Sequence, residues 1–201
     1  MRERKSAEIL AAARELFLRN GFAATSIDAI ASAAGVSKAT VYSNFADKDA
    51  LLITLLDSIT TEATGILQHA TAGLEGDATL RERFVAVGTA LVAGVLRPEV
   101  LSLRRLAIAQ ASAFPKPVGE YWRRGPAATI ELLTAHLERM HAAGELLVPD
   151  AHEAASQLAY ALVGPLQDRA LLSPADPAPA KAAVDEHVES TVDAFLRAYA
   201  R

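Results

Sequence analysis

Apolar residues recur along this chain at intervals of three and four positions, and no segment shows a sustained two-residue alternation. This spacing predicts an all-α protein of about nine helices. The first helix is expected over residues 5–20. Gly21 can adopt the left-handed conformation that ends a helix, so Phe22 is expected to fold back onto Phe17. The apolar stripe of this helix consists of Ile9, Ala13, Leu16 and Phe17.

The segment after this glycine predicts two short helices joined by a tight turn. Thr25 and Asp28 have the spacing of a capping box for the first of them, which begins at Thr25 or at the serine that follows. Gly35 ends this helix after about two turns. Ser37 is expected to cap the next helix, which ends near Phe45. The pattern predicts a helix-turn-helix.

The remaining chain continues with helical spacing, and Asp47 is expected to cap the next helix. Gly125-Pro126 and Gly164-Pro165 lie inside predicted helices and should kink them. We therefore expect a three-helix domain over residues 1–47 and a helical body over residues 48–201. The helices of the body are expected over residues 48–70, 79–96, 99–113, 117–142, 151–172 and 181–200. The breaks are expected at residues 73–77, 97–98, 115–117, 144–150 and 173–179.

The composition fits a helical protein inside the cell. Apolar residues make up 51 % of the 201 positions, which is enough for a substantial core. The absence of cysteine excludes disulfides and thiolate metal sites. The longest uncharged apolar stretch, residues 84–96, is too short to span a bilayer, and charges interrupt any apolar signal region near the N-terminus. We expect a cytoplasmic protein with no membrane partner.

The charge distribution permits a nucleic-acid partner without demanding one. The net charge of −4 alone argues against DNA binding, but the first 50 residues carry seven Lys or Arg against six Asp or Glu. The sequence contains no nucleophile elbow, no phosphate-cradling glycine loop and no metal-ligand spacing. We expect neither an enzyme nor a bound cofactor. A helical adaptor that binds protein remains an alternative to a DNA-binding protein.

Short motifs follow one another at fixed spacing through the N-terminal quarter of the chain. They are Gly21-Phe22, Thr25-Ser26-Ile27, Ile30-Ala31, Ala34-Gly35-Val36-Ser37-Lys38, Thr40-Val41-Tyr42, Asn44-Phe45, Lys48 and Leu51-Leu52. Over residues 5–52, this order and spacing resembles the TetR family of one-component transcriptional regulators. The resemblance implies a homodimer that binds a palindromic operator in double-stranded DNA. It also implies regulation by an unidentified small-molecule effector, and repression relieved by that ligand is the expected mode.

The resemblance also assigns roles to residues of the third helix and its neighbours. It implies backbone-phosphate contacts by Thr25, Ser37, Tyr42 and Lys48. It places Lys38 and Ala39 where the third helix enters the groove, and Thr40, Ser43 and Asn44 where base contacts vary. Hydroxyl, amide and ammonium groups match phosphate oxygens and base edges. The family often has glycine where this chain has Ala39, and an aromatic residue or histidine at positions 43 and 44. Capping, partial burial and simple solvation are the structural alternatives. The expected DNA-binding residues are Thr25, Ser26, Ser37, Lys38, Ala39, Thr40, Tyr42, Ser43, Asn44 and Lys48.

The helical body offers candidates for a dimer interface and for a ligand pocket. Apolar stripes on the last two helices would suit a four-helix interface between two subunits, unless they pack inside one chain. The expected interface residues are Leu158, Leu162, Leu166, Val188, Val192, Phe195 and Tyr199. The family resemblance implies a ligand cavity, although each candidate could equally be ordinary core. The expected pocket residues are Leu103, Ala107, Gln110, Phe114, Trp122 and Ile130.

Overall fold

The computed structural model describes residues 2–58, 71, 74, 78–173, 175 and 178–200. Within these residues the chain is helical apart from turns and one isolated antiparallel bridge between Leu146 and Ala200, so the predicted all-α class is confirmed. The predicted boundary after residue 47 stays a prediction. By spatial proximity the chain forms two compact units, one made of Met1–Thr60 and Ser102–Tyr121 and one made of Thr61–Leu101 and Trp122–Arg201.

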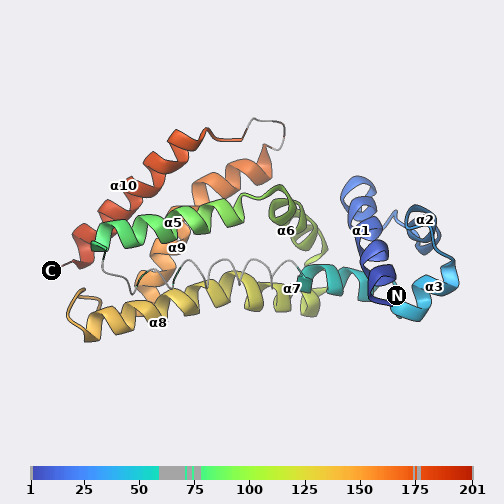
Figure 1. Cartoon of the computed structure of the whole chain (residues 1–201), viewed down its shortest axis with the longest axis horizontal. Helices are drawn as coiled ribbons and strands as arrows, with labels where there is room; N and C mark the ends of the chain where they lie inside the picture. Colours follow the sequence, from blue (N-terminus) through green and yellow to red (C-terminus); the bar gives the residue numbers. More distant parts are fainter. Residues whose placement is uncertain are drawn as a thin grey trace. The chain divides into compact units, whose positions relative to one another are not determined.

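The first unit begins with α1 (Arg2–Asn20; Figure 1), and this helix ends as predicted at a left-handed glycine. Gly21 has a φ of 82°, and its amide donates to the Phe17 carbonyl over 3.0 Å. The chain then reverses, and the Phe22 ring lies 5.0 Å from the Phe17 ring. The predicted fold-back of Phe22 is therefore confirmed. It covers the end of α1 with apolar surface.

The second helix, α2 (Ile27–Ala33), starts two residues later than the earlier of its predicted starts. Ser26 is the N-cap, and its hydroxyl accepts from the Ala29 amide over 3.1 Å. Thr25 instead is buried and donates its hydroxyl to the carbonyls of Leu16 and Gly21. The predicted capping box is therefore wrong, because the Thr25 hydroxyl faces into the unit rather than toward the first turn of α2.

The third helix, α3 (Lys38–Asn44), follows a turn at Gly35, whose φ is 64°. As predicted, the Ser37 hydroxyl caps α3 by accepting from the Thr40 amide over 3.1 Å. α1, α2 and α3 contact one another in pairs, and the inward side chains of α2 and α3 are fully covered. The predicted helix-turn-helix is confirmed. Its central buried residues are Ile30, Ala31 and Val41.

A fourth helix begins at residue 48 and is described as far as residue 58. The Asp47 carboxylate accepts from the Ala50 amide over 2.7 Å, as the sequence predicted. The predicted continuation to residue 70 and most of the predicted break at 73–77 lie outside the described residues. The first unit is completed by most of α6 (Pro98–Gln110) and α7 (Pro115–Trp122).

The second unit is built from α5 (Leu80–Val95), α8 (Ala128–Ala142), α9 (Ala151–Leu172) and α10 (Lys181–Tyr199). α10 packs along α5, as Figure 1 shows, and α9 contacts α5, α8 and α10. The rings of Phe84 and Phe195 lie 5.3 Å apart in the core. Of the described helices, none alone is long and apolar enough to cross a bilayer. α5 and α6 meet that criterion only when taken together across their break.

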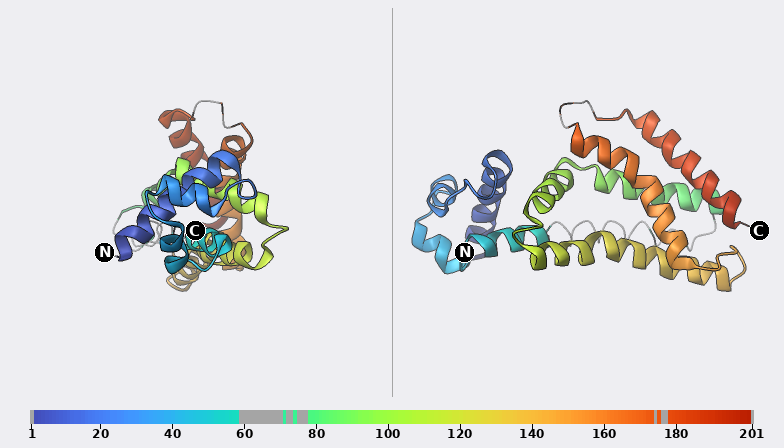
Figure 2. Two further views of the ribbon diagram at one scale, coloured as in Figure 1. Left: turned by 90° about the vertical axis from the view of Figure 1, so that its right-hand side faces the viewer. Right: turned by 180° about the vertical axis from the view of Figure 1, so that it is seen from behind.

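The two prolines inside predicted helices disturb them in different ways. Pro126 lies in a π-helical turn, η2 (Arg123–Ala127), between α7 and α8. Pro165 lies within α9, whose ribbon is bent (Figure 2). A proline has no amide hydrogen, so the Ala161 carbonyl, four residues earlier, loses its helical donor. His187 of α10 lies there instead, with Nε2 3.1 Å from the Ala161 carbonyl and 3.0 Å from that of Leu162.

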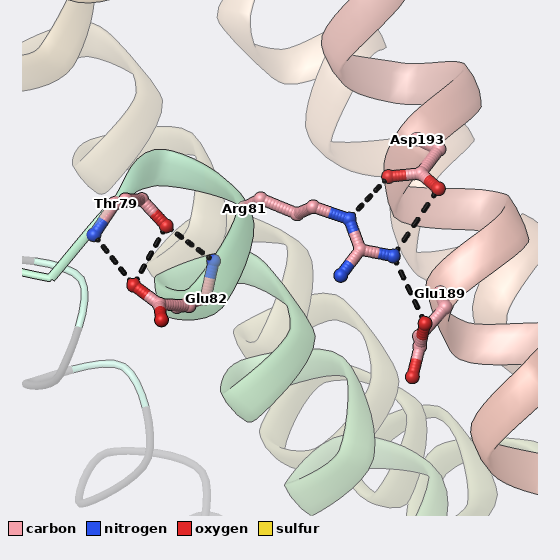
Figure 3. A network of polar contacts seen from close by, with 5 residues as sticks. All are labelled: Thr79, Arg81, Glu82, Glu189 and Asp193. Carbon is pink, nitrogen blue, oxygen red and sulfur yellow. Dashed lines mark hydrogen bonds and ion pairs between the residues drawn. The ribbon is translucent and has the colours of Figure 1, made fainter.

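Ion pairs connect the start of α5 to α10. The Arg81 guanidinium donates to Asp193 over 2.7 Å and to Glu189 over 2.9 Å (Figure 3). The hydrogen bond from Arg81 holds the pKa of the Asp193 carboxyl below its usual value. Next to it, Thr79 and Glu82 form a reciprocal capping box at the N-terminus of α5. The cap sets where α5 begins, and the ion pairs hold this end of α5 against α10.

Candidate nucleic-acid interface

The outward face of α3 presents polar side chains, while its inward face is apolar. Val41 is fully covered, and the next residue, Tyr42, leaves 49 % of its surface exposed. Lys38, Ala39 and Ser43 are exposed as well, and positions 40 and 44 are partly exposed. A short helix that buries one face and displays hydroxyl, amide and ammonium groups on the other can enter a groove without losing its core contacts.

Hydroxyl groups along α3 are already organised by local hydrogen bonds. The Ser37 and Thr40 hydroxyls lie 2.8 Å apart. Further along, the Ser43 hydroxyl and the Asn44 amide both donate to the Thr40 carbonyl, over 2.9 Å and 2.8 Å. These bonds hold the two side chains against their own helix. To bind a base edge, the Ser43 hydroxyl or the Asn44 amide must give up its hydrogen bond to the Thr40 carbonyl. Whether the base replaces that bond depends on which base is present.

Lys38 at the start of α3 forms an ion pair with Asp28 of α2. The ammonium lies 2.9 Å from the carboxylate, and both side chains are exposed. The hydrogen bond to Asp28 raises the pKa of Lys38, so the lysine keeps its charge. Pairs as exposed as this one contribute little to stability. The Lys38 charge is accessible to a polyanion. A phosphate that binds this ammonium must take the place of the Asp28 carboxylate.

Thr25 and Lys48, both expected to contact phosphate, have protein partners in the structure. Thr25 is 2 % exposed, and its hydroxyl bonds to the carbonyls of Leu16 in α1 and of Gly21. The Lys48 ammonium lies 2.8 Å from the Phe22 carbonyl and 2.9 Å from the Thr25 carbonyl. Sequence reasoning did not anticipate these contacts, because the partners of Lys48 lie more than twenty positions earlier. The phosphate contacts of both residues stay predictions.

The six expected pocket residues are divided between the two units. Leu103 and Ala107 of α6 are almost fully buried, and the ring of Phe114 packs edge-on against the Phe22 ring over 5.1 Å. Together with Gln110 they belong to the first unit. Trp122, which is 41 % exposed, and the buried Ile130 belong to the second. Their role in binding a ligand stays a prediction.

Most of the expected dimer residues make their contacts inside the second unit. Val188 and Leu162 both approach Gly88 of α5, where no side chain stands between them and the helix. A contact between subunits can bury only surface that the single chain leaves exposed. The role of these residues in a dimer stays a prediction. The residues covered in this way are Leu158, Leu162, Val188, Val192 and Phe195, while Leu166 and Tyr199 are partly exposed.

Two family models match the chain and together cover most of its length. Residues 9–55 match the model of the bacterial regulatory proteins of the tetR family. Residues 82–201 match the C-terminal domain of the AefR-like transcriptional repressors. The first match contains the helix-turn-helix and the start of the fourth helix, and the second contains all helices from α6 onward together with most of α5.

Relatives with assigned names agree with these models. The HTH-type transcriptional repressor Rv3405c of Mycobacterium tuberculosis is 31 % identical over 165 residues, which are 82 % of this chain and 76 % of that protein. The match to the regulator EthR of Mycolicibacterium smegmatis is 29 % identical and covers 67 % of this chain but 62 % of EthR.

Solved structures share the fold over the full chain. A TetR-family regulator from Mesorhizobium loti superposes with a TM-score of 0.90 at 29 % identity, covering 100 % of this chain and 99 % of that one. The flavonoid-responsive regulator FrrA has a TM-score of 0.78 at 30 % identity, with 98 % of each chain covered. The chain therefore belongs to the TetR family of helix-turn-helix transcriptional regulators and carries an AefR-like C-terminal domain.

Proposed function

We propose that the protein is a repressor that binds a palindromic operator as a homodimer, with α3 of each subunit in the major groove. The observation that carries this proposal is the exposed polar face of α3 on a helix whose other face is buried. The major groove is about 12 Å wide and accepts a helix presented in this way. The name of the mycobacterial relative, a transcriptional repressor, supports repression over activation.

The residues of this face divide into two expected roles. Ser37 and Tyr42 lie at the start and on the exposed side of α3, where a hydroxyl group can contact a phosphate. Ser26 offers a second hydroxyl at the N-terminus of α2, and Ala39 lets the backbone approach the groove. Base edges are assigned to the side chains of Thr40, Ser43 and Asn44. The exposed Lys38 ammonium is assigned to a phosphate where the helix enters the groove.

Asn44 gives a test of base contact that is separate from overall affinity. Asn44→Ala is expected to change the preferred base at one pair of symmetry-related operator positions, because an asparagine amide pairs bidentately with adenine. The salt dependence of binding should stay as in the wild type, since no charge is removed. Selection of operators by the variant measures the first effect, and an unchanged selected sequence would exclude Asn44 from base contact.

The dimer is proposed to form through the faces of α9 and α10 that the single chain leaves exposed. On α9 these include Tyr160, which is 53 % exposed, and Leu172, which is 83 % exposed. On α10 the small residues Ala183, Ser190 and Ala194 are exposed. Dimers of helix-turn-helix proteins bind half-sites about 34–36 Å apart. Tyr160→Glu should yield a monomer in sedimentation equilibrium.

A small-molecule effector is proposed to release the repressor from DNA. An effector shifts the protein between two shapes only if it binds one of them more tightly. The structural relative FrrA is described as flavonoid-responsive, which makes flavonoids the first class of probe. Leu103, Ala107, Gln110 and Phe114 are the candidates from α6 and its end that lie together in one unit.

One experiment tests the operator, the dimer and the effector together. The full chain is used to select bound sequences from a random pool of duplex DNA, with and without a flavonoid panel. The proposal expects an enriched palindrome whose half-sites lie about one helical turn apart, and its loss when an effector is present. Enrichment of a single asymmetric site would contradict the dimer. Enrichment of no sequence at all would contradict operator binding.

A further inference from the structure

We infer that Lys48 is a positioning residue: its ammonium closes the chain segment that contains α2 and α3 onto the turn after α1, and so orients the recognition helix. This inference rests on the proposed DNA binding and deepens it. It also gives Lys48 a task different from the phosphate contact that its sequence position suggested.

All hydrogen-bonding capacity of this ammonium is used inside the protein. It donates to the carbonyl oxygens of Phe22, Ala23 and Thr25 over 2.8, 3.3 and 2.9 Å. A lysine ammonium has three N–H donors and accepts nothing, so the three carbonyls account for every donor. A phosphate could bind the ammonium only by displacing one of these carbonyls. Phosphate binding would then give the ammonium one hydrogen bond and cost it another.

The turn that receives Lys48 is fixed from several sides. The ammonium also lies 4.5 Å from the centre of the Phe22 ring, within the range of a cation–π contact. That ring packs against Phe17 over 5.0 Å and against Phe114 over 5.1 Å. From inside the unit, the Thr25 hydroxyl bonds to the carbonyls of two earlier residues. Lys48 therefore docks onto a rigid acceptor rather than onto a loose loop.

Because of its position in the chain, Lys48 connects the two ends of the segment that contains α2 and α3. It is the first residue of the fourth helix, and its nearest-numbered acceptor, Thr25, lies 23 residues earlier. Both α2 and α3 lie within the segment between them. Joining the ends of a loop removes much of its conformational freedom. The ammonium thus holds the recognition helix in one orientation relative to α1 and the fourth helix.

Lys48→Met tests the inference, because methionine keeps an unbranched apolar stem and removes all three donors. We expect the affinity for the selected duplex to fall by about tenfold or more, since charge-assisted bonds that order the segment are lost. The slope of log K against log salt should not change. Lys38→Met is the matched control at an exposed lysine of α3, and its slope should become shallower by about 0.9, the value for one phosphate.

Amide hydrogen exchange of the free protein gives a second readout that needs no DNA. Lys48→Met should speed exchange in α2 and α3 by about tenfold, whereas the amides of α1 should exchange as in the wild type. Lys38→Met should leave exchange in all three helices unchanged. If Lys48→Met unfolds the whole unit, the amides of α1 will exchange as fast as those of α2 and α3. That result would overturn the inference, because the ammonium would then stabilise the unit as a whole.

The outcomes separate this inference from the proposed function. A slope that becomes shallower by about 0.9 in Lys48→Met, with exchange unchanged, would show a phosphate contact and overturn the positioning role. Unchanged affinity and unchanged exchange would overturn it as well. If the wild type bound no duplex, the proposed function would fail, and faster exchange confined to α2 and α3 would still support the closure of the segment by Lys48.

Discussion

Gly88 lies on α5 where this helix meets α9 and α10, and Gly88→Ala tests the packing of the second unit. A Cβ atom at this position would lie 2.9 Å from Cγ1 of Val188 and 3.1 Å from Cδ2 of Leu162. Val188 is 0 % exposed and Leu162 is 1 % exposed, so both have little room to move away. The added methyl group must push α10 or α9 outward, or force a side chain off its preferred rotamer.

The magnitude follows from two opposing effects. Overfilling a packed core costs about 1–3 kcal/mol, whereas replacing glycine by alanine inside a helix gains about 1 kcal/mol. Gly94 lies on the same helix, and a Cβ atom there would meet nothing within 4 Å. Gly94→Ala therefore carries the gain without the clash. We expect Gly88→Ala to be less stable than Gly94→Ala by about 1–3 kcal/mol.

Urea unfolding followed by circular dichroism measures this difference. All variants must be compared at one protein concentration, because the proposed dimerisation would couple stability to concentration. Val188→Ala in the Gly88→Ala background removes the methyl group closest to the added Cβ atom, so the double variant should lose less stability than the sum of the single losses. Equal stability of Gly88→Ala and Gly94→Ala would refute the close approach of α5 and α10 described above.

Two further predictions concern polar contacts of the second unit. His187→Ala should cost about 0.5–1.5 kcal/mol in urea unfolding, because the Ala161 carbonyl loses its substitute donor. The cost should shrink in a Pro165→Ala background, where residue 165 can donate to that carbonyl, and an equal cost in both backgrounds would contradict the substitution. Asp193→Asn should lower the melting temperature at pH 7, where the wild-type carboxylate is ionised and paired with Arg81. Because this pKa is depressed, the difference should vanish as the pH falls through it, below the ordinary value of about 3.9; a difference that persists at lower pH would contradict the ion-pair explanation.

Local rules explain why most of the first unit could be predicted from the sequence. Gly21, Ser37 and Asp47 each contact backbone groups within four residues. Their positions in the sequence therefore predict where α1 ends and where α3 and the fourth helix begin. The same rules could not decide between Thr25 and Ser26 as the cap of α2. Both are hydroxyl residues next to the start of α2, and only the packing of the turn against α1 decides which of them faces inward.

Contacts between distant segments could not be predicted in this way. An apolar stripe on α10 shows that one face is covered, but its spacing does not say whether α5 of the same chain or a second subunit covers it. Val188 beside Gly88 answers that question for the single chain. Likewise, the sequence around Lys48 predicts an exposed cation at the start of a helix. Only the folded structure shows that the turn after α1 brings three carbonyl oxygens to its ammonium.

The central claim, that α3 presents its polar face to operator DNA, is tested most directly by the salt dependence of binding. Fluorescence anisotropy can follow the affinity of the full chain for its selected palindromic duplex from about 50 to 200 mM salt. We predict an affinity that falls steeply with salt and is lost with Tyr42→Ala, because the 49 % exposed tyrosine is the largest side chain on this face. Affinity that is absent at every salt concentration, or that is unaffected by Tyr42→Ala and by salt, would contradict the claim.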